Sequence, residues 1–154
     1  MGKEIERKYL VTGDGWREGA SGRVFRQGYL SSRKERTVRV RTDGEKGTLT
    51  VKGPSTGAAR DEFEYEIPLA DAQEMLDRLC ERPLIEKTRY VVPFGGRRWE
   101  VDVFAGDNLG LVVAEVELES ESAPLELPPW AGREVTDDPR YYNANLIRTP
   151  YRSW

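Results

Sequence analysis

Residues 35–52 read ERTVRVRTDGEKGTLTVK and contain two short stretches in which apolar and polar side chains alternate. In VRVR at 38–41 the valines fall on one face of a strand and the arginines on the other, because successive side chains point to opposite faces. Asp43-Gly44 between the two stretches is a pair typical of tight β-turns. The segment therefore predicts a β-hairpin with one apolar face and one charged face.

The same two-residue period recurs along most of the chain. Strands are expected at 3–11, 23–30, 35–42, 47–52, 60–68, 84–93, 96–104 and 111–119. An amphipathic helix is expected at 69–81, a second helical piece at 139–147, and loops at 53–59 and 120–132. Eight strands in a chain of this size favour a closed antiparallel barrel or a strongly curled sheet, because closure removes exposed edges.

Composition narrows the classes of function. The chain has 154 residues without an internal repeat, so a single domain over 1–154 is expected. Its 24 Lys and Arg against 27 Asp and Glu give a net charge of −3, which argues against nucleic-acid binding. The absence of histidine excludes a Ser-His-Asp triad and an ordinary zinc site, and one cysteine excludes a disulfide framework.

The sequence shows neither a typical signal peptide nor a membrane-spanning run, and both observations bear on where the protein is located. The first residues, MGKEIERKYLV, become charged too early to be typical of a signal peptide. No run approaches the roughly 20 apolar residues that a membrane-spanning helix needs. A soluble, cytoplasmic protein is therefore expected.

The charged faces of the expected strands are sorted by sign. Acidic side chains occupy the strands at 60–68, 96–104 and 111–119, basic ones occupy 35–42, 47–52 and 84–93, and 3–11 carries both. A sheet face that simply meets water is expected to mix the signs, because neighbouring like charges repel each other. The sorting therefore indicates a role for these faces beyond solvation.

Charges of one sign on a confined face require a partner of the other sign. Carboxylates two residues apart on a strand lie about 6.6–6.8 Å apart, and their repulsion calls for a cation. Mg²⁺ and Mn²⁺ take oxygen ligands and bridge carboxylates to substrate phosphates, whereas Arg and Lys bind phosphate oxygens. The pattern favours a metal and polyphosphate site, provided that the charged faces point inward, which the sequence does not fix.

The segment Glu4-Ile5-Glu6-Arg7-Lys8 resembles the ExExK signature of the CYTH, or triphosphate tunnel metalloenzyme, family. Further stretches resemble the family in the same order: VRVR (38–41), LTVKG (49–53), RDEFEYEI (60–67), EKTRY (86–90), WEVDVF (99–104), AEVELE (114–119) and EVTDDPRYYNANL (134–146). The resemblance implies an eight-stranded closed antiparallel barrel around a polar tunnel. It also implies Mg²⁺- or Mn²⁺-dependent chemistry on triphosphates.

Site residues follow from this resemblance position by position. Glu4 and Glu6 are expected as catalytic metal ligands, with Lys8 as a catalytic residue that faces the phosphates. The phosphate chain is expected to bind Lys8, Arg39, Arg41, Lys52, Lys87 and Arg89, and the acidic side to be completed by Glu62, Glu64, Asp102, Glu115 and Glu117. The expected acidic side does not include Glu66, Glu100 and Glu119, which share the charged strand face but lie nearer the strand ends. Arg60 and Tyr29 also lie on this face and could extend the lining of the site.

Hydrolysis of inorganic triphosphate with release of orthophosphate is the expected activity, because few aromatic residues have the parity to stack a purine. Adenylate cyclisation, as in class IV-type cyclases, and thiamine triphosphate hydrolysis are alternatives within the family. A polyphosphate-binding module without turnover is an alternative of another class. The expected partner is a small triphosphate, with no nucleic acid and no membrane, and the protein is expected to be a monomer or a homodimer.

Overall fold

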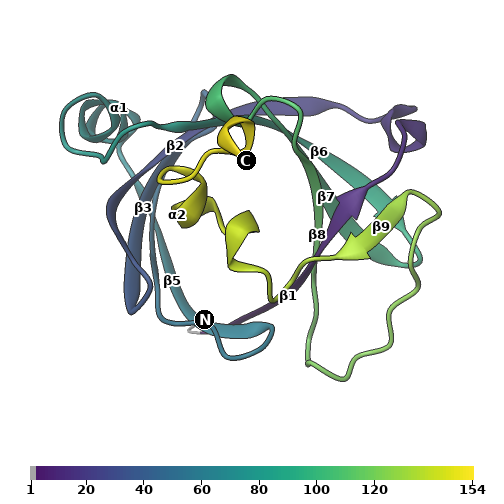
Figure 1. The fold of residues 1–154 in the computed structure, drawn as a ribbon. Helices are drawn as coiled ribbons and strands as arrows, with labels where there is room; N and C mark the ends of the chain where they lie inside the picture. The colour runs from purple at the N-terminus through teal and green to yellow at the C-terminus, as the bar shows by residue number, and fades with distance from the viewer. Residues whose placement is uncertain (1–2) are drawn as a thin grey trace.

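The computed structural model describes residues 3–154, whose strands close into an antiparallel barrel (Figure 1). The barrel strands are β1 (Lys3–Val11), β2 (Gly22–Arg33), β3 (Arg36–Thr42), β4 (Gly47–Lys52), β5 (Ala59–Ile67), β6 (Ile85–Phe94), β7 (Arg97–Phe104) and β8 (Val112–Glu117). A ninth strand, β9 (Ala131–Glu134), extends the sheet at β1. The order is β5-β4-β3-β2-β6-β7-β8-β1, and β1 pairs with β5 to complete the ring.

The N-terminal strand β1 makes the closure by dividing its length between neighbours. Residues Lys3–Ile5 pair with Ala59–Asp61 of β5, whereas residues 6–10 pair with β8. Beyond the short β5 contact, β9 takes up the free edge of β1 at Tyr9 and Val11. The ExExK segment therefore lies at the seam of the barrel, where its alternate side chains point inward together.

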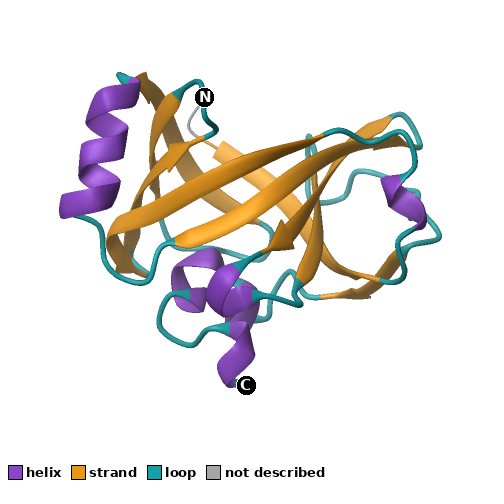
Figure 2. Cartoon of the chain, turned by 90° about the horizontal axis from the view of Figure 1, so that it is seen from above, coloured by secondary structure: helices purple, strands orange, loops and turns teal. Residues whose placement is uncertain are grey.

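The helical elements lie outside the strands. The helix α1 (Leu69–Arg78) connects β5 to β6 and packs on the outer surface of β3 and β4 (Figure 2). The turns η1 (Gly15–Arg17) and η2 (Gly106–Asn108) lie in connections. The C-terminal segment, residues 135–154, contains η3 (Pro139–Tyr141), α2 (Asn143–Leu146) and η4 (Tyr151–Ser153). It gathers at one end of the barrel and crosses that mouth (Figures 1 and 2).

Apolar side chains lie mainly on the outer barrel surface, where the connecting segments cover them. One cluster joins Trp99, Val101, Ala114 and Val116 to Trp130 of the long β8–β9 connection. A second cluster lies beneath α1. The third closes the barrel end at the C-terminal segment, where Leu146 and Ile147 pack on Tyr29, Ile85 and Phe104.

The closed eight-stranded barrel expected from the sequence is confirmed. Its strand bounds agree within two residues, except that β2 continues to Arg33 where residue 30 is the expected end. Three elements outside these strands also differ. Residues 131–134 form β9 although the expected loop extends to 132, because AGRE is too short to show a two-residue period. The helix expected to Glu81 ends at Arg78. The piece expected at 139–147 is two separate turns rather than one helix. Among the helices of residues 3–154, none is long and apolar enough to cross a membrane.

The packing of α1 yields a test of stability. Leu76 is fully buried beneath the helix, whereas Leu79, just after its end, is 67% exposed. Leu76→Ala is expected to lower the free energy of unfolding by about 2–5 kcal/mol, because it leaves a cavity against the barrel. Leu79→Ala, the matched control, should change it by less than about 0.5 kcal/mol. Urea unfolding followed by circular dichroism measures both, and equal losses would contradict this docking of α1.

Candidate active site

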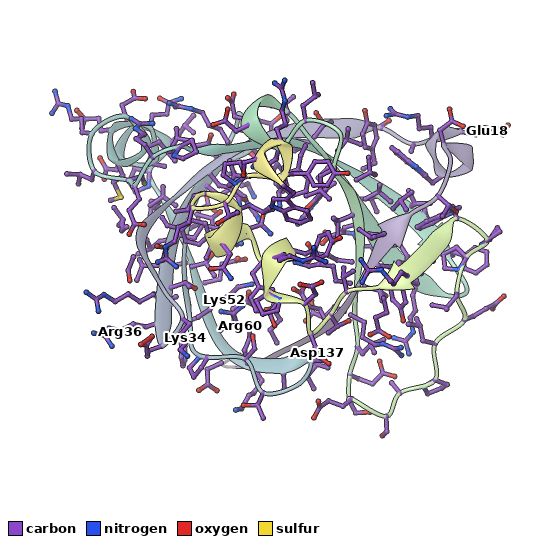
Figure 3. All side chains as sticks on the ribbon, in the orientation of Figure 1. Glu18, Lys34, Arg36, Lys52, Arg60 and Asp137 are labelled. Atoms are coloured by element: carbon purple, nitrogen blue, oxygen red, sulfur yellow. The ribbon has the colours of Figure 1, made fainter. Side chains whose placement is uncertain are left out.

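A cavity of about 650 Å³ occupies the interior of the barrel. Twelve of the side chains expected from the sequence line it: Glu4, Glu6, Lys8, Arg39, Arg41, Lys52, Glu62, Glu64, Lys87, Arg89, Glu115 and Glu117. In Figure 3, Lys52 and Arg60 lie within the ring of strands, whereas Glu18 lies outside it. The charged faces of the strands therefore point inward, as the interpretation of a shared charged site requires.

The strand order gathers each sign of charge on one side of the cavity. The basic strands β4, β3 and β6 are joined through β2, and the acidic strands β7, β8 and β5 are joined through β1. We call these the basic wall (Arg39, Arg41, Lys52, Lys87, Arg89) and the acidic wall (Glu4, Glu6, Glu62, Glu64, Glu115, Glu117). Two opposed charged walls thus line one cavity.

Several ion pairs join the two walls. Nζ of Lys52 lies 3.0 Å from Oε1 of Glu4 and 3.5 Å from Oε2 of Glu62. Nη2 of Arg39 donates to Oγ1 of Thr50 at 3.3 Å, and this hydroxyl donates to Oε2 of Glu64 at 3.1 Å. These contacts compensate part of each wall and leave other groups without a counter-charge.

On the acidic wall, Glu6, Glu62 and Glu117 have raised pKa values. The pKa of Glu6 is raised well above its ordinary value by burial and by the neighbouring carboxylates of Glu115 and Glu4. Burial and Glu4 likewise raise the pKa values of Glu62 and Glu117. A bound cation would favour the ionised forms of these groups.

On the basic wall a buried carboxylate holds two of the cations. Asp102 is 1% exposed, and its Oδ2 lies 2.8 Å from Nζ of Lys87. Nε and Nη2 of Arg89 donate to its two oxygens at 2.8 and 2.9 Å. Burial alone would raise the pKa of Asp102, but the charges of Lys87 and Arg89 lower it to about 2, so this carboxylate stays ionised at neutral pH.

One carboxylate does not neutralise the basic wall. Burial, together with the charges of Arg89 and Arg41, lowers the pKa of Lys87 to about 7, although the charge of Asp102 acts in the opposite direction. Burial and the nearby Arg39 and Arg89 lower the pKa of Arg41 to about 9. These shifts mark a surplus of positive charge, which a bound anion would relieve.

The C-terminal segment supplies polar groups to the cavity. Nζ of Lys8 donates to the carbonyl of Tyr141 at 3.2 Å, and it lies 5.9 Å from the ring centre of Tyr142. Nζ of Lys87 donates to Oδ1 of Asn143 at 3.2 Å. Two lysines from different strands, β1 and β6, thus contact the segment that closes one end of the barrel.

The structure revises the list of cavity residues at its margins. Asp102 lies behind the lining, with both oxygens bound to Lys87 and Arg89. Its assignment as a metal ligand stays a prediction, and it would require these contacts to open. Glu100 is not expected in the site because it lies near a strand end, but it lines the cavity. Arg60 and Tyr29 line it as well. Glu119 instead pairs with Arg97 on the surface.

Three residues that sequence reasoning missed contact the basic wall. The ring of Phe25 lies between two guanidinium groups, 4.6 Å from Cζ of Arg41 and 5.0 Å from Cζ of Arg89. Oε1 of Gln27 accepts from Nε of Arg41 at 2.9 Å, and Asn143 reaches the site from the C-terminal segment. Strand parity could have found Phe25 and Gln27, which share the inward face of β2 with Tyr29, but no local signal points to Asn143.

The acidic wall offers oxygen donors to a divalent cation. Among residues 3–154, no three acidic or cysteine side chains already have the arrangement of a metal site. The donors are nevertheless oxygen atoms, as Mg²⁺ and Mn²⁺ prefer, and the raised pKa values of Glu6, Glu62 and Glu117 indicate a local excess of negative charge. The wall fits such an ion once its carboxylates turn toward it.

The closed barrel and its two inward charged walls define a tunnel-type anion site. The family model of the CYTH domain matches residues 2–151, and the chain belongs to this family. It is 54% identical to an inorganic triphosphatase of Acetivibrio thermocellus over 154 residues, which cover 100% of this chain and 99% of that protein. It is 40% identical over 148 residues to an inorganic triphosphatase of Nitrosomonas europaea, with 93% and 95% of the two chains covered.

A solved structure is similar over the same length. A crystal structure of an inorganic triphosphatase superimposes with a TM-score of 0.66 and 38% identity. The match covers 96% of this chain and 95% of the other. The similarity therefore extends over the whole barrel and the segment that closes it.

The pairing of Asp102 yields a second test of stability. Asp102→Asn leaves Lys87 and Arg89 without their buried counter-charge and is expected to lower the free energy of unfolding by about 3–5 kcal/mol. Asp77→Asn is the matched control, because Asp77 pairs with Arg26 at 2.6 Å on the surface. That change should cost about 0–1 kcal/mol. Chemical denaturation at neutral pH compares them, and a loss for Asp102→Asn no larger than the control's would contradict a strong buried pairing.

Proposed function

We propose that this protein is an inorganic triphosphatase that hydrolyses triphosphate to pyrophosphate and orthophosphate with Mg²⁺ or Mn²⁺. The proposal rests on the two opposed walls. The acidic wall keeps negative charge and the basic wall keeps positive charge that the ion pairs between them do not neutralise. The 54% identity to an inorganic triphosphatase over the full chain supports the same activity. The proposal includes a small phosphate substrate and a cytoplasmic location.

The basic wall binds the phosphate chain. Arg39, Arg41 and Arg89 supply guanidinium forks that match phosphate oxygens in pairs, whereas Lys52 and Lys87 supply compact point charges. Arg89 keeps part of its fork on Asp102 and so remains fixed while it binds substrate. The chain's own role is chiefly to position the phosphates and to stabilise the charge that develops during transfer.

The acidic wall holds the metal. Glu4, Glu6, Glu62, Glu64, Glu115 and Glu117 are the candidate ligands, direct or through water, and Glu4 leaves Lys52 to take part. When bound, the ion supplies charge neutralisation at the phosphate oxygens and acidifies water. The carboxylates of this wall accept the proton that the attacking water loses. Lys8, held at the carbonyl of Tyr141, stabilises the terminal phosphate.

The lining favours a compact anion over a nucleotide. Of the aromatic side chains in the cavity, Phe25 has its ring taken up by Arg41 and Arg89. Tyr142 faces Lys8, and Tyr29 is 5% exposed within the apolar cluster at the barrel end. Each of these three rings is thus already engaged by neighbouring side chains, which supports triphosphate as the better substrate.

Assays of phosphate release test the proposal. Triphosphate, pyrophosphate, ATP and thiamine triphosphate are supplied with Mg²⁺, with Mn²⁺ and with a chelator. We expect the highest kcat/KM for triphosphate and loss of turnover in chelator. Glu6→Gln and Arg41→Ala should each lower kcat/KM by about 10²–10³-fold, because they remove charges aimed at the metal and the phosphates.

Surface variants with the same chemical change provide the controls. Glu86→Gln alters an exposed carboxylate, and Arg26→Ala removes a surface arginine that pairs with Asp77. Both should retain the activity of the unaltered protein. Turnover without metal, or wild-type rates in folded Glu6→Gln and Arg41→Ala, would overturn the mechanism. Release of pyrophosphate and cyclic AMP from ATP as the main reaction would overturn triphosphatase activity in favour of cyclisation.

A further inference from the structure

The C-terminal segment carries one side chain that contacts the basic wall directly. Oδ1 of Asn143 accepts from Nζ of Lys87 at 3.2 Å and from Nε2 of Gln27 at 3.4 Å. A carbonyl oxygen has two lone pairs, so both are occupied. Gln27 is fully buried, and its Oε1 accepts from Nε of Arg41 at 2.9 Å. A continuous chain of hydrogen bonds therefore runs from Arg41 through two neutral amides to Lys87.

This chain fixes how the two cations are presented to the cavity. The ammonium group of Lys87 has three N–H donors, of which Asp102 and Asn143 take two, so one is left for a ligand. Arg41 uses Nε for Gln27, which leaves the two terminal nitrogens of its fork for phosphate oxygens. Both groups are therefore oriented before an anion arrives, which lowers the ordering cost of binding.

Asn143 is itself held in place by the residues that follow it in the sequence. Leu146 and Ile147 are buried in the apolar cluster with Tyr29, Ile85 and Phe104. Nη2 of Arg148 donates to the carbonyl of Ser32 at 2.9 Å, which ties the segment to β2. The amide therefore cannot follow a displaced lysine without disturbing this packing.

We propose that Asn143 and Gln27 are positioning residues, and that their neutral amide chain orients Lys87 and Arg41 to bind the phosphate chain. This rests on the proposed function, since it concerns the same anion site. The proposal requires both amide side chains to be uncharged. A carboxylate at either position would also accept the hydrogen bond, but its charge would cancel the surplus that attracts the anion.

Substitutions at Asn143 separate positioning from a structural role. Asn143→Leu removes the acceptor at nearly constant size and is expected to weaken triphosphate binding about tenfold, the loss of one charge-assisted hydrogen bond. Asn143→Asp keeps the shape and the acceptor but adds a negative charge, and should weaken binding at least as much as Asn143→Leu. A merely structural asparagine would tolerate the isosteric Asp. Equal affinity of Asn143→Asp and the unaltered protein would therefore overturn the proposal.

Calorimetric titration with inorganic triphosphate in chelator measures this binding apart from turnover. Under metal-activated turnover the same variants should lower kcat/KM about tenfold, because the loss of one charge-assisted hydrogen bond leaves the cations that bind the phosphate chain less well oriented. Unaltered binding by both Asn143 variants would overturn the proposal. Failure of the wild-type protein to turn over triphosphate, with these binding differences intact, would instead overturn the proposed function alone.

A double-mutant cycle tests the hydrogen-bonded chain of Gln27 and Asn143. Gln27→Leu and Asn143→Leu break one continuous chain, so their combined loss of affinity should be well below the product of the single losses. Asn108→Ala is the matched control. Oδ1 of Asn108 accepts a hydrogen bond of 2.8 Å from the backbone N–H of Tyr151, and Asn108 does not line the cavity. Asn108→Ala should leave triphosphate affinity unchanged and combine additively with Asn143→Leu. Additive losses for the Gln27 and Asn143 pair would overturn the connected chain.

Discussion

Opposite charges enclosed in one barrel are the constraint on which this structure depends. A ring of inward arginines and lysines alone would carry a desolvation penalty too large for a small domain, and a ring of carboxylates would be equally unstable. The two walls reduce this penalty for each other through pairs such as Lys52 with Glu4 and Arg39 with Glu64. The compensation is partial, and the remainder is what makes the cavity receptive to a cation on one side and an anion on the other.

Turning the charges inward determines where the rest of the chain must go. The apolar side chains of the same strands face outward, so the barrel needs an external cover. The helix α1 covers β3 and β4, and the connection that carries Trp130 covers Trp99 and its neighbours. At the end where Leu146 and Ile147 pack against Phe104 and Ile85, the inward face becomes apolar as well. The elements outside the barrel are therefore as much a consequence of the charged interior as the cavity is.

Much of this arrangement could be predicted from the sequence because strand parity is a local property. VRVR at 38–41 already separates valines from arginines, and the ExExK segment aligns three charges on one face. The direction of those faces depends on closure of the ring, which local patterning does not encode. Asn143 and β9 escaped prediction for a related reason. A neutral amide in an irregular segment and a four-residue strand acquire their roles only through contacts with residues distant in sequence.

The carbonyl of Tyr141 and the amide of Asn143 follow all nine strands in the sequence. Translation proceeds from the N-terminus, so the strands that carry Lys8 and Lys87 leave the ribosome before the groups that hold their ammonium ends. The charged strands of a nascent barrel can therefore assemble before Tyr141 and Asn143 are present to orient these two ammonium groups.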